Sequence, residues 1–397
     1  MNDAARPVVR LLPGHDKRVA LGHPWVYSNE IAMDAATKAL PPGTLVSLLT
    51  ANGKHLGVAT FNPHTLIAAR LFHREASLKI DEGFFISRLE RALPLRRRLY
   101  DAPFYRVIHA EADGLPGVIV DRFGDVLACQ INIVGMARLE DEFLSALKKV
   151  FNPSAIVMRN DTAARSLEGL TGEECVAFGT LTPPIEIAEN GARFLIDPLA
   201  GQKTGWFYDQ RENRRFVSRF AAGARVLDLY CFAGGFAVQA ALAGADQVLA
   251  IDSSASALEW ATAAARLNGV DARCRFARGE VFAELERLHA QGERFDLVIA
   301  DPPAFARSRK DLGPALRGYR KLARLAASLV AKGGVLFIAS CSHQVEPEAF
   351  AEEVRRGMHD AQREGRVILS SGAAPDHPVH PFLPESAYLK AETLVLD

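Results

Sequence analysis

Two apolar runs separated by a helical segment constrain the fold of this chain most strongly. The runs FDLVIA (295–300) and GVLFIA (334–339) have the length and composition of buried strands, and residues 318–334 between them have helical periodicity. A strand, a crossover helix and a second strand form a parallel βαβ unit, whose strands are usually neighbours in the sheet. The sequence therefore predicts a parallel α/β sheet in this part of the chain.

Each predicted strand is followed by a reactive side chain. Asp301 begins the motif Asp-Pro-Pro after the first run, and Cys341 is the centre of Ser-Cys-Ser after the second. Neighbouring strands lie ~4.8 Å apart, and ligands of open α/β sheets bind at the carboxyl ends of the strands. We therefore expect a carboxylate and a thiol to meet at one rim of the sheet.

Length and composition indicate an ordinary globular protein of two or three domains. The chain has 397 residues, of which 49% are hydrophobic and 24% charged. Its first residues do not resemble a signal peptide, and no apolar run approaches the ~20 residues of a membrane-spanning helix. The five cysteines lack C-x-x-C spacing, which predicts a reduced, cytoplasmic protein with no metal site.

Three regions differ in their pattern. Residues 1–75 contain short β-like runs separated by turn signals, which is typical of a small barrel or sandwich. Residues 76–190 begin with a basic helix and continue with strands and a helix over residues 136–151, so they predict a central α/β domain. Residues 191–397 alternate strand and helix, which predicts a doubly wound parallel sheet.

Residues 224–254 predict a cofactor site. A strand ends near Asp228, a loop with two glycines precedes a helix, and a second strand ends at Asp252, where a carboxylate can accept from ribose hydroxyls. The spacing G-x-G-x-x-G, which places a pyrophosphate on a helix N-terminus, is missing. A nucleoside cofactor without phosphates, such as S-adenosylmethionine, fits better. The expected cofactor contacts of this unit also include Phe232, Gly234 and Ser253.

A loop after the third strand should reach the adenine. Glu280 is the candidate acceptor there, although an acid at the start of a helix can simply stabilise that helix. Cys231 lies inside the cofactor loop and is interpreted as packing. Cys129, Cys175 and Cys274 lie in strand-like segments and are expected in the core.

Asp301 and Cys341 together fit methylation of a pyrimidine at C5. Addition of a thiolate at C6 makes C5 nucleophilic, and an acid near N3 stabilises the charge that develops. The base that removes the C5 proton stays open between His343 and a water. A free thiol has a pKa of ~8.5, so the nucleophile needs nearby positive charge or the substrate itself for activation.

The formal net charge is zero, but two segments are strongly basic. Residues 305–325 carry seven Lys or Arg against one Asp, directly after the Asp-Pro-Pro motif, and can hold RNA phosphates. Residues 86–107 carry six Arg, and there a solvated helix face is at least as good an interpretation. The RNA-binding candidates of the first segment are Arg307, Arg309, Lys310 and Arg317.

These motifs resemble those of the RlmI family of class I S-adenosylmethionine-dependent methyltransferases, which make 5-methylcytosine in large-subunit ribosomal RNA. The similarity spans nearly the whole chain. HPWVYSNEI (23–31) and residues 57–72 resemble its N-terminal PUA domain, a small RNA-binding barrel, and residues 111–125 resemble its central domain. GQKTGWFYDQRENRR (201–215), DLYCFAGGF, DPPAF and SCSH resemble its Rossmann-like methyltransferase domain.

The resemblance implies a role for each matching residue. Cys341 would be the nucleophile with Asp301 beside the target base, and Trp25 would stack on RNA unless it is a core residue. The partner would be 23S ribosomal RNA or the large-subunit particle, and a homodimer is a further expectation. Glu280 departs from the Asp expected at that position, which affects the adenine geometry. Around the cofactor the resemblance places Asp228, Asp252, Glu280 and Asp301, and at its methionine end Lys203, Phe207, Asp209 and Arg211.

Other functions fit parts of the pattern. A methyltransferase acting on a purine shares the Asp-Pro-Pro motif but needs no thiol, and a uridine C5 enzyme uses the same covalent chemistry. A non-catalytic RNA-binding assembly factor would keep the fold, although the intact Asp228, Asp252, Asp301 and Cys341 argue against it. A NAD-dependent dehydrogenase is disfavoured by the glycine spacing.

Overall fold

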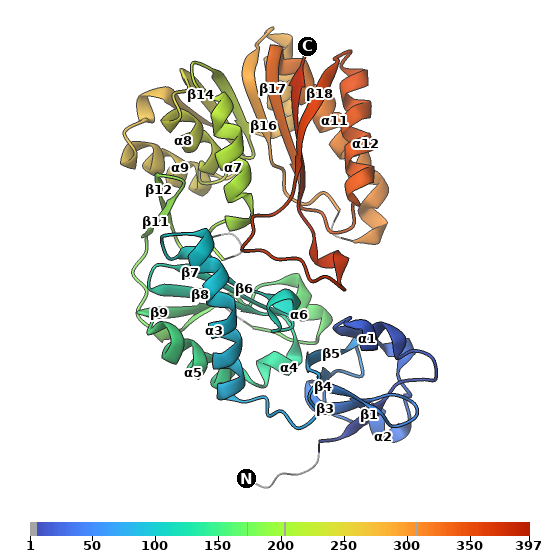
Figure 1. Cartoon of the computed structure of the whole chain (residues 1–397). Helices are drawn as coiled ribbons and strands as arrows, with labels where there is room; N and C mark the ends of the chain where they lie inside the picture. Colours follow the sequence, from blue (N-terminus) through green and yellow to red (C-terminus); the bar gives the residue numbers. More distant parts are fainter. Residues whose placement is uncertain (1–5, 173, 202–203, 307) are drawn as a thin grey trace. The chain divides into compact units, whose positions relative to one another are not determined.

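The computed structural model describes residues 6–172, 174–201, 204–306 and 308–397. Their contacts divide the chain into two compact units, each formed by three stretches of sequence, whose elements are labelled in Figure 1. Unit 1 consists of Met1–Ile185, Asp197–Trp206 and Pro375–Ser386, and unit 2 consists of Glu186–Ile196, Phe207–Ala374 and Ala387–Asp397.

Unit 1 begins with a five-stranded sheet in the order β1-β3-β4-β5-β2. Apart from the parallel pair β1–β3, its neighbouring strands are antiparallel. The turn at Asn52-Gly53 joins β3 to β4 with Gly53 at φ 81°, a conformation that glycine adopts without strain. The small β fold expected here is confirmed. Its elements are β1 (Val8–Arg10), α1 (Lys17–Leu21), β2 (Trp25–Tyr27), α2 (Ala35–Lys38), β3 (Thr44–Leu49), β4 (His55–Phe61) and β5 (Ile67–His73).

A second five-stranded sheet of unit 1 has the order β10-β9-β8-β7-β6. The rings of Phe85 on α3 and Phe143 on α5 meet 5.4 Å apart in its core. The single helix expected over residues 136–151 is wrong, because α4 ends at Ala137 and α5 starts at Glu140. The elements are α3 (Glu82–Leu99), β6 (Phe104–His109), β7 (Val118–Phe123), β8 (Val126–Ile131), α4 (Val134–Ala137), α5 (Glu140–Phe151), β9 (Ala155–Met158), α6 (Ala163–Leu167) and β10 (Cys175–Gly179).

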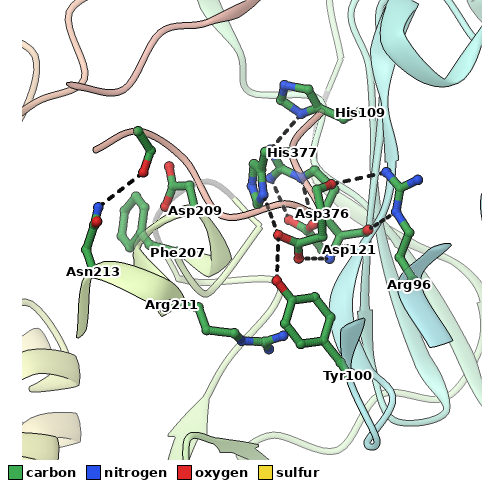
Figure 2. A network of polar contacts seen from close by, with 12 residues as sticks. Arg96, Tyr100, His109, Asp121, Phe207, Asp209, Arg211, Asn213, Asp376 and His377 are labelled. Carbon is green, nitrogen blue, oxygen red and sulfur yellow. Dashed lines mark hydrogen bonds and ion pairs between the residues drawn. The ribbon is translucent and has the colours of Figure 1, made fainter. Parts of the chain in front are cut away.

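The stretch Pro375–Ser386 joins unit 1 through a buried polar network around Asp376, shown in Figure 2. Its carbonyl oxygen accepts from Arg96 Nη2 at 3.1 Å, and its carboxylate accepts from the Arg106 backbone at 2.9 Å and contacts His377 Nδ1 at 2.8 Å. Arg96 is only 1% exposed and also forms an ion pair with Asp113. The basic segment 86–107 is therefore in part a structural network, not only the solvated helix face or RNA surface expected.

Unit 2 contains the seven-stranded sheet β15-β14-β13-β16-β17-β19-β18. All pairs from β15 to β17 are parallel, as predicted, whereas β19 is antiparallel to both of its neighbours. Contacts join α7, α8 and α9 into one helical layer and α10, α11 and α12 into another, and Figure 1 shows them on opposite sides of the sheet. The predicted βαβ unit is β16–α11–β17, with Ala300 paired to Ile338.

The elements of unit 2 are β11 (Ile185–Glu189), β12 (Ala192–Ile196), α7 (Arg211–Val217), β13 (Arg225–Leu229), α8 (Gly235–Leu242), β14 (Gln247–Asp252), α9 (Ala255–Leu267), β15 (Cys274–Arg278), α10 (Val281–Ala290), β16 (Phe295–Ala300), α11 (Leu312–Leu329), β17 (Val330–Ser340), α12 (Pro347–Asp360), β18 (Gly365–Ser371) and β19 (Lys390–Leu396). Short 3-10 helices include η2 (Ala110–Asp113), η3 (Tyr208–Gln210) and η6 (Arg309–Asp311). Within the described residues, no helix has the length and apolar character needed to cross a membrane.

Candidate active site

The strand order of unit 2 reverses at β13, which lies between β14 and β16. Ligand crevices of α/β sheets form at the carboxyl ends of the strands at such a point. Asp228 lies near the end of β13, Asp252 ends β14 and Asp301 directly follows β16. Asp301 and Asp252 are close enough to Asp228 to act on its ionisation. The fold thus brings three predicted acids together.

The loop after β13 has a strained backbone. Tyr230 and Phe232 adopt φ values of 60° and 48°, and Gly234 adopts 78°. Non-glycine residues at positive φ are uncommon, and strain of this kind gathers at ligand sites. The loop is held by Asp252, which accepts from the backbone N–H groups of Phe232 and Ser254, each at 2.9 Å. The expected ribose partner is therefore fixed in one orientation.

Asp228 is buried with one oxygen satisfied. Its Oδ2 accepts from the backbone of Ala237 at 3.0 Å. Its Oδ1 has no hydrogen-bond partner among the described residues. Burial raises the pKa of Asp228 well above its usual value, and the negative charges of Asp301 and Asp252 add to the shift. A buried polar atom left without a protein partner at a strained loop fits a site built for a ligand.

Glu280 caps a helix. Its carboxylate accepts from the backbone of Phe282 at 3.2 Å and of Ala283 at 2.8 Å at the start of α10. This geometry favours the structural alternative raised from the sequence, and the adenine contact stays a prediction. Ser253 is exposed, and its carbonyl oxygen accepts from Arg278 at 3.1 Å.

The segment before α7 lies against the cofactor loop. The ring of Phe207 meets that of Phe232 edge-to-face at 5.2 Å. Asp209 accepts from the hydroxyl of Tyr388. Arg211 is buried with its Nε 3.4 Å from Glu189, so the expected methionine-end cation already faces a carboxylate. Figure 2 includes Phe207, Asp209 and Arg211. The predicted Lys203 lies outside the described residues.

Cys341 and the Asp-Pro-Pro loop meet at the carboxyl ends of β16 and β17. The thiol of Cys341 lies 3.9 Å from the carbonyl oxygen of Pro302, and both Cys341 and Asp301 are half-buried. Asp301 Oδ1 accepts from Gln210 Nε2 at 2.8 Å. Asp301 and Cys341 therefore lie at the same rim of the sheet, and their catalytic roles stay a prediction.

Three buried hydroxyls, which we call the hydroxyl cluster, hold the Ser-Cys-Ser motif. The Tyr319 hydroxyl on α11 lies 2.9 Å from Ser340 Oγ and 2.8 Å from Ser342 Oγ. Ser342 Oγ also accepts from the backbone of Ala306 at 3.2 Å. Burial raises the pKa of Tyr319, so its hydroxyl stays neutral at physiological pH. The cluster ties the residues on both sides of Cys341 to α11 and to the Asp-Pro-Pro loop.

Residues from the start of β19 complete the site, and sequence reasoning missed them. Lys390 is 8% exposed and donates to the carbonyl oxygens of Ser342 and of Tyr388. The Tyr388 ring stacks on exposed His343 with ring centres 5.1 Å apart. A lysine next to an apolar run was the one sequence signal for Lys390.

The other cysteines differ in their surroundings. Cys231 and Cys129 are buried, and burial raises the pKa of both thiols, as expected for packing residues. Cys274 is half-buried. The expectation that Cys175 lies in the core is wrong: it is exposed, as are the other residues of β10, the strand at the edge of its sheet.

Some of the predicted RNA-binding cations are exposed near the site. Arg309 and Lys310 on η6 and Arg317 on α11 are exposed, whereas Arg320 pairs with Asp360 and Lys321 with Glu286. Arg307 lies outside the described residues. RNA binding by these cations stays a prediction.

In unit 1, Trp25 is half-buried and fixed by polar contacts. Its indole N–H donates to Glu111 on η2 at 2.7 Å, and the Arg70 guanidinium lies 5.2 Å from the ring centre. Trp25 is therefore fixed by its contacts without being a buried core residue, and its stacking on RNA stays a prediction. No group of His, Cys, Asp and Glu that could hold a metal ion occurs among the residues with described positions.

Comparison with known proteins shows the family of this chain. Residues 161–368 match the family model of S-adenosylmethionine-dependent methyltransferases, and residues 9–74 match that of PUA-like domains. Ribosomal RNA large subunit methyltransferase I of Erwinia tasmaniensis is 37% identical over 96% of this chain and 97% of its own length. The protein of the same name from Aeromonas hydrophila is also 37% identical, with the same coverage of both chains.

Solved structures show the same fold. A provisionally assigned S-adenosylmethionine-dependent methyltransferase from Streptococcus mutans aligns with a TM-score of 0.83 at 20% identity, covering 98% of this chain and all of that one. The structure of SMU.776, also a provisional methyltransferase and solved with SAH, aligns with the same TM-score and identity over 99% of this chain and 100% of its own.

Proposed function

The chain belongs to the ribosomal RNA large subunit methyltransferase I family of S-adenosylmethionine-dependent methyltransferases, and we propose that it methylates C5 of a cytosine in 23S ribosomal RNA through a covalent adduct of Cys341. Its cofactor is S-adenosylmethionine. The residues present fit this cofactor, since Asp252 is oriented toward a strained loop and Asp228 keeps a buried oxygen without a protein partner.

The observation that carries the proposal is the position of Cys341 beside the Asp-Pro-Pro loop. The thiol lies 3.9 Å from the Pro302 carbonyl, one residue after the carboxyl of Asp301. A purine-methylating enzyme needs no thiol at this position. A thiol against the Asp-Pro-Pro loop, at the carboxyl ends of β16 and β17, therefore supports a pyrimidine as the target base.

The proposed reaction uses these two side chains in sequence. The Cys341 thiolate adds to C6, and the electrons of the C5–C6 double bond become available at C5. Asp301 lies near N3 of the ring and stabilises the charge that develops there. The cofactor supplies the methyl group that C5 takes up. Loss of the C5 proton to a base then restores the double bond, breaks the bond between sulfur and C6, and returns Cys341 as a thiolate.

RNA is proposed to be held by both units. The exposed Arg309, Lys310 and Arg317 would contact phosphates near the catalytic thiol. The PUA-like domain of unit 1 would supply a second contact. Either 23S RNA or the large-subunit particle fits this arrangement. The homodimer expected from the sequence has no support in the fold or the relatives, and the cytoplasmic location stays a prediction.

Nucleoside mass spectrometry tests the proposal. Purified enzyme, ribosomal RNA and methyl-labelled S-adenosylmethionine should give labelled 5-methylcytosine, and Cys341→Ala should lower turnover by roughly 10³-fold or more. Cofactor affinity, measured by calorimetry, should stay near that of the wild type. Cys231→Ala is the matched control, since its thiol is buried in the cofactor loop. Label in a purine or in 5-methyluridine, or activity that survives in Cys341→Ala, would contradict the proposal.

A further inference from the structure

Lys390 places a buried cation at the backbone of the Ser-Cys-Ser motif. β19 runs antiparallel to β17, and Lys390 pairs in register with Ser340. Its ammonium group donates to the carbonyl oxygen of Ser342 and, at 3.1 Å, to that of Tyr388. Lys390 thus contacts the chain on both sides of Cys341: its backbone is in register with the residue before, and its ammonium bonds the residue after.

The surroundings of Lys390 do not neutralise its charge. Burying an ammonium group is costly unless it is paired with an opposite charge. Lys390 forms no ion pair with a carboxylate within the described ranges, and its two acceptors are neutral carbonyl groups. Burial lowers the pKa of Lys390 to about 8, while the charges of Cys341 and Glu346 act in the opposite direction. The group is therefore still mostly protonated at neutral pH.

We propose that Lys390 is a positioning residue that stabilises the thiolate of Cys341. This inference rests on the proposed role of Cys341 as the nucleophile. Charge interactions are reciprocal, so an ammonium group that is stabilised by the thiolate stabilises the thiolate equally. The thiol proton leaves to water, and the ammonium keeps its three protons. The sequence predicted that the thiol needs a nearby positive charge but did not identify it. The ammonium group of Lys390, on β19, supplies this charge.

Other titratable groups also surround the thiol. The charge of Glu346 acts on Lys390, and Tyr319, whose pKa is raised by burial, is neutral and contributes no charge. Lys390 is a buried cation. Among the described residues, the groups near the Ser-Cys-Ser motif include Asp301 after β16, Tyr319 on α11, Glu346 before α12, Lys390 on β19, and the stacked rings of His343 and Tyr388.

The pH dependence of alkylation by iodoacetamide tests the inference without turnover. Cys341 and exposed Cys175 fall in different tryptic peptides, so mass spectrometry follows both in one sample. In the wild type, the pH at which alkylation of Cys341 reaches half its maximal rate (the midpoint) should lie below the pKa of ~8.5 of an ordinary thiol. In Lys390→Met it should rise by about one unit or more, which slows alkylation near pH 7 by about tenfold. Cys175 should not change in any variant.

Two further variants separate charge from structure. Lys390→Arg keeps a permanent cation and should keep the low midpoint. Lys332→Met removes an exposed lysine from β17 and should leave the midpoint unchanged. A wild-type midpoint at or above the ordinary value would overturn the inference even if no variant folds. A midpoint in folded Lys390→Met equal to that of the wild type would also overturn it.

Methyl transfer distinguishes this inference from the proposed function. If Lys390 acts through the thiol, the turnover of Lys390→Met should fall at neutral pH and recover as the pH rises, at unchanged cofactor affinity. A purely structural role predicts a loss that does not depend on pH. If the wild type has a low alkylation midpoint but makes no 5-methylcytosine, the proposed function is contradicted. The inference that Lys390 stabilises the thiolate of Cys341 would then still hold.

Discussion

The cofactor half and the reacting half of the site are built in different ways. In the cofactor half, Asp228 and Asp252 accept from backbone N–H groups of residues 232, 237 and 254, so all partners lie within one βαβ segment. In the reacting half, Cys341 is flanked by serines that side chains of Tyr319 and Lys390 hold, from α11 and β19. The first half is local and depends on the backbone, whereas the second assembles distant side chains.

This difference predicts how each half fails. Most substitutions leave a backbone donor in place, so among side chains the loop of the cofactor half depends chiefly on the acids that accept from it. The hydroxyl cluster and Lys390 can each be deleted singly, and each deletion should affect the thiol while leaving cofactor affinity intact. Affinity and turnover should therefore separate along this division.

Asp252→Ala should give the largest effect on affinity. The substitution removes the acceptor of two backbone hydrogen bonds, at Phe232 and Ser254, together with the expected ribose partner. Hydrogen bonds to charged groups contribute ~1.5–3 kcal/mol each, so affinity for S-adenosylmethionine should fall about 100-fold in calorimetry. Glu259→Ala, at an exposed acid on α9, is the matched control. Unchanged affinity in Asp252→Ala would remove this residue from the cofactor site.

Tyr319→Phe should lower turnover with a smaller effect. It deprives Ser340 and Ser342 of a shared partner in a buried place, which costs ~1–3 kcal/mol of stability. We expect turnover to fall about tenfold, in line with a small displacement of Cys341, while cofactor affinity stays constant. If the melting temperature falls but turnover does not, the hydroxyl cluster supports only the fold. That result would contradict the claim that side chains in the reacting half control turnover.

Asp228→Asn should give the smallest effect, and one that depends on pH. Because burial raises the pKa of Asp228, the folded protein keeps a proton that the unfolded chain releases above about pH 4. The wild type therefore loses stability as the pH rises from there, and asparagine, which cannot ionise, does not. The variant should melt about 2–4 °C higher at pH 8 in calorimetry, and the difference should vanish toward pH 4. A difference independent of pH would contradict this account.

The sequence predicted the cofactor half of the site well and the reacting half only in part. The strand that ends near Asp228, the strand that ends at Asp252 and the neighbouring strands before Asp301 and Cys341 were predicted correctly, because apolar runs and glycines reflect the backbone conformation directly. Lys390 and Tyr388 were missed, because a side chain that reaches the site from an antiparallel strand leaves no spacing pattern. Glu280 shows a different limit of sequence-based prediction. In the sequence, this acid fits a helix cap and a ligand contact equally well, and only its hydrogen bonds from the backbone of Phe282 and Ala283 favour the cap.

The position of β19 has a consequence for folding. β18 precedes β19 in the chain, yet β19 lies between β17 and β18 in the sheet. During synthesis β18 emerges before β19 and therefore has no strand to pair with. Until β19 emerges, the edge of β17 is exposed to other strands. Because Lys390 lies on β19, the thiol of Cys341 gains this neighbouring cation only after β19 has paired with β17. A partly folded chain would therefore carry an ordinary thiol, and reactivity would develop together with the finished sheet.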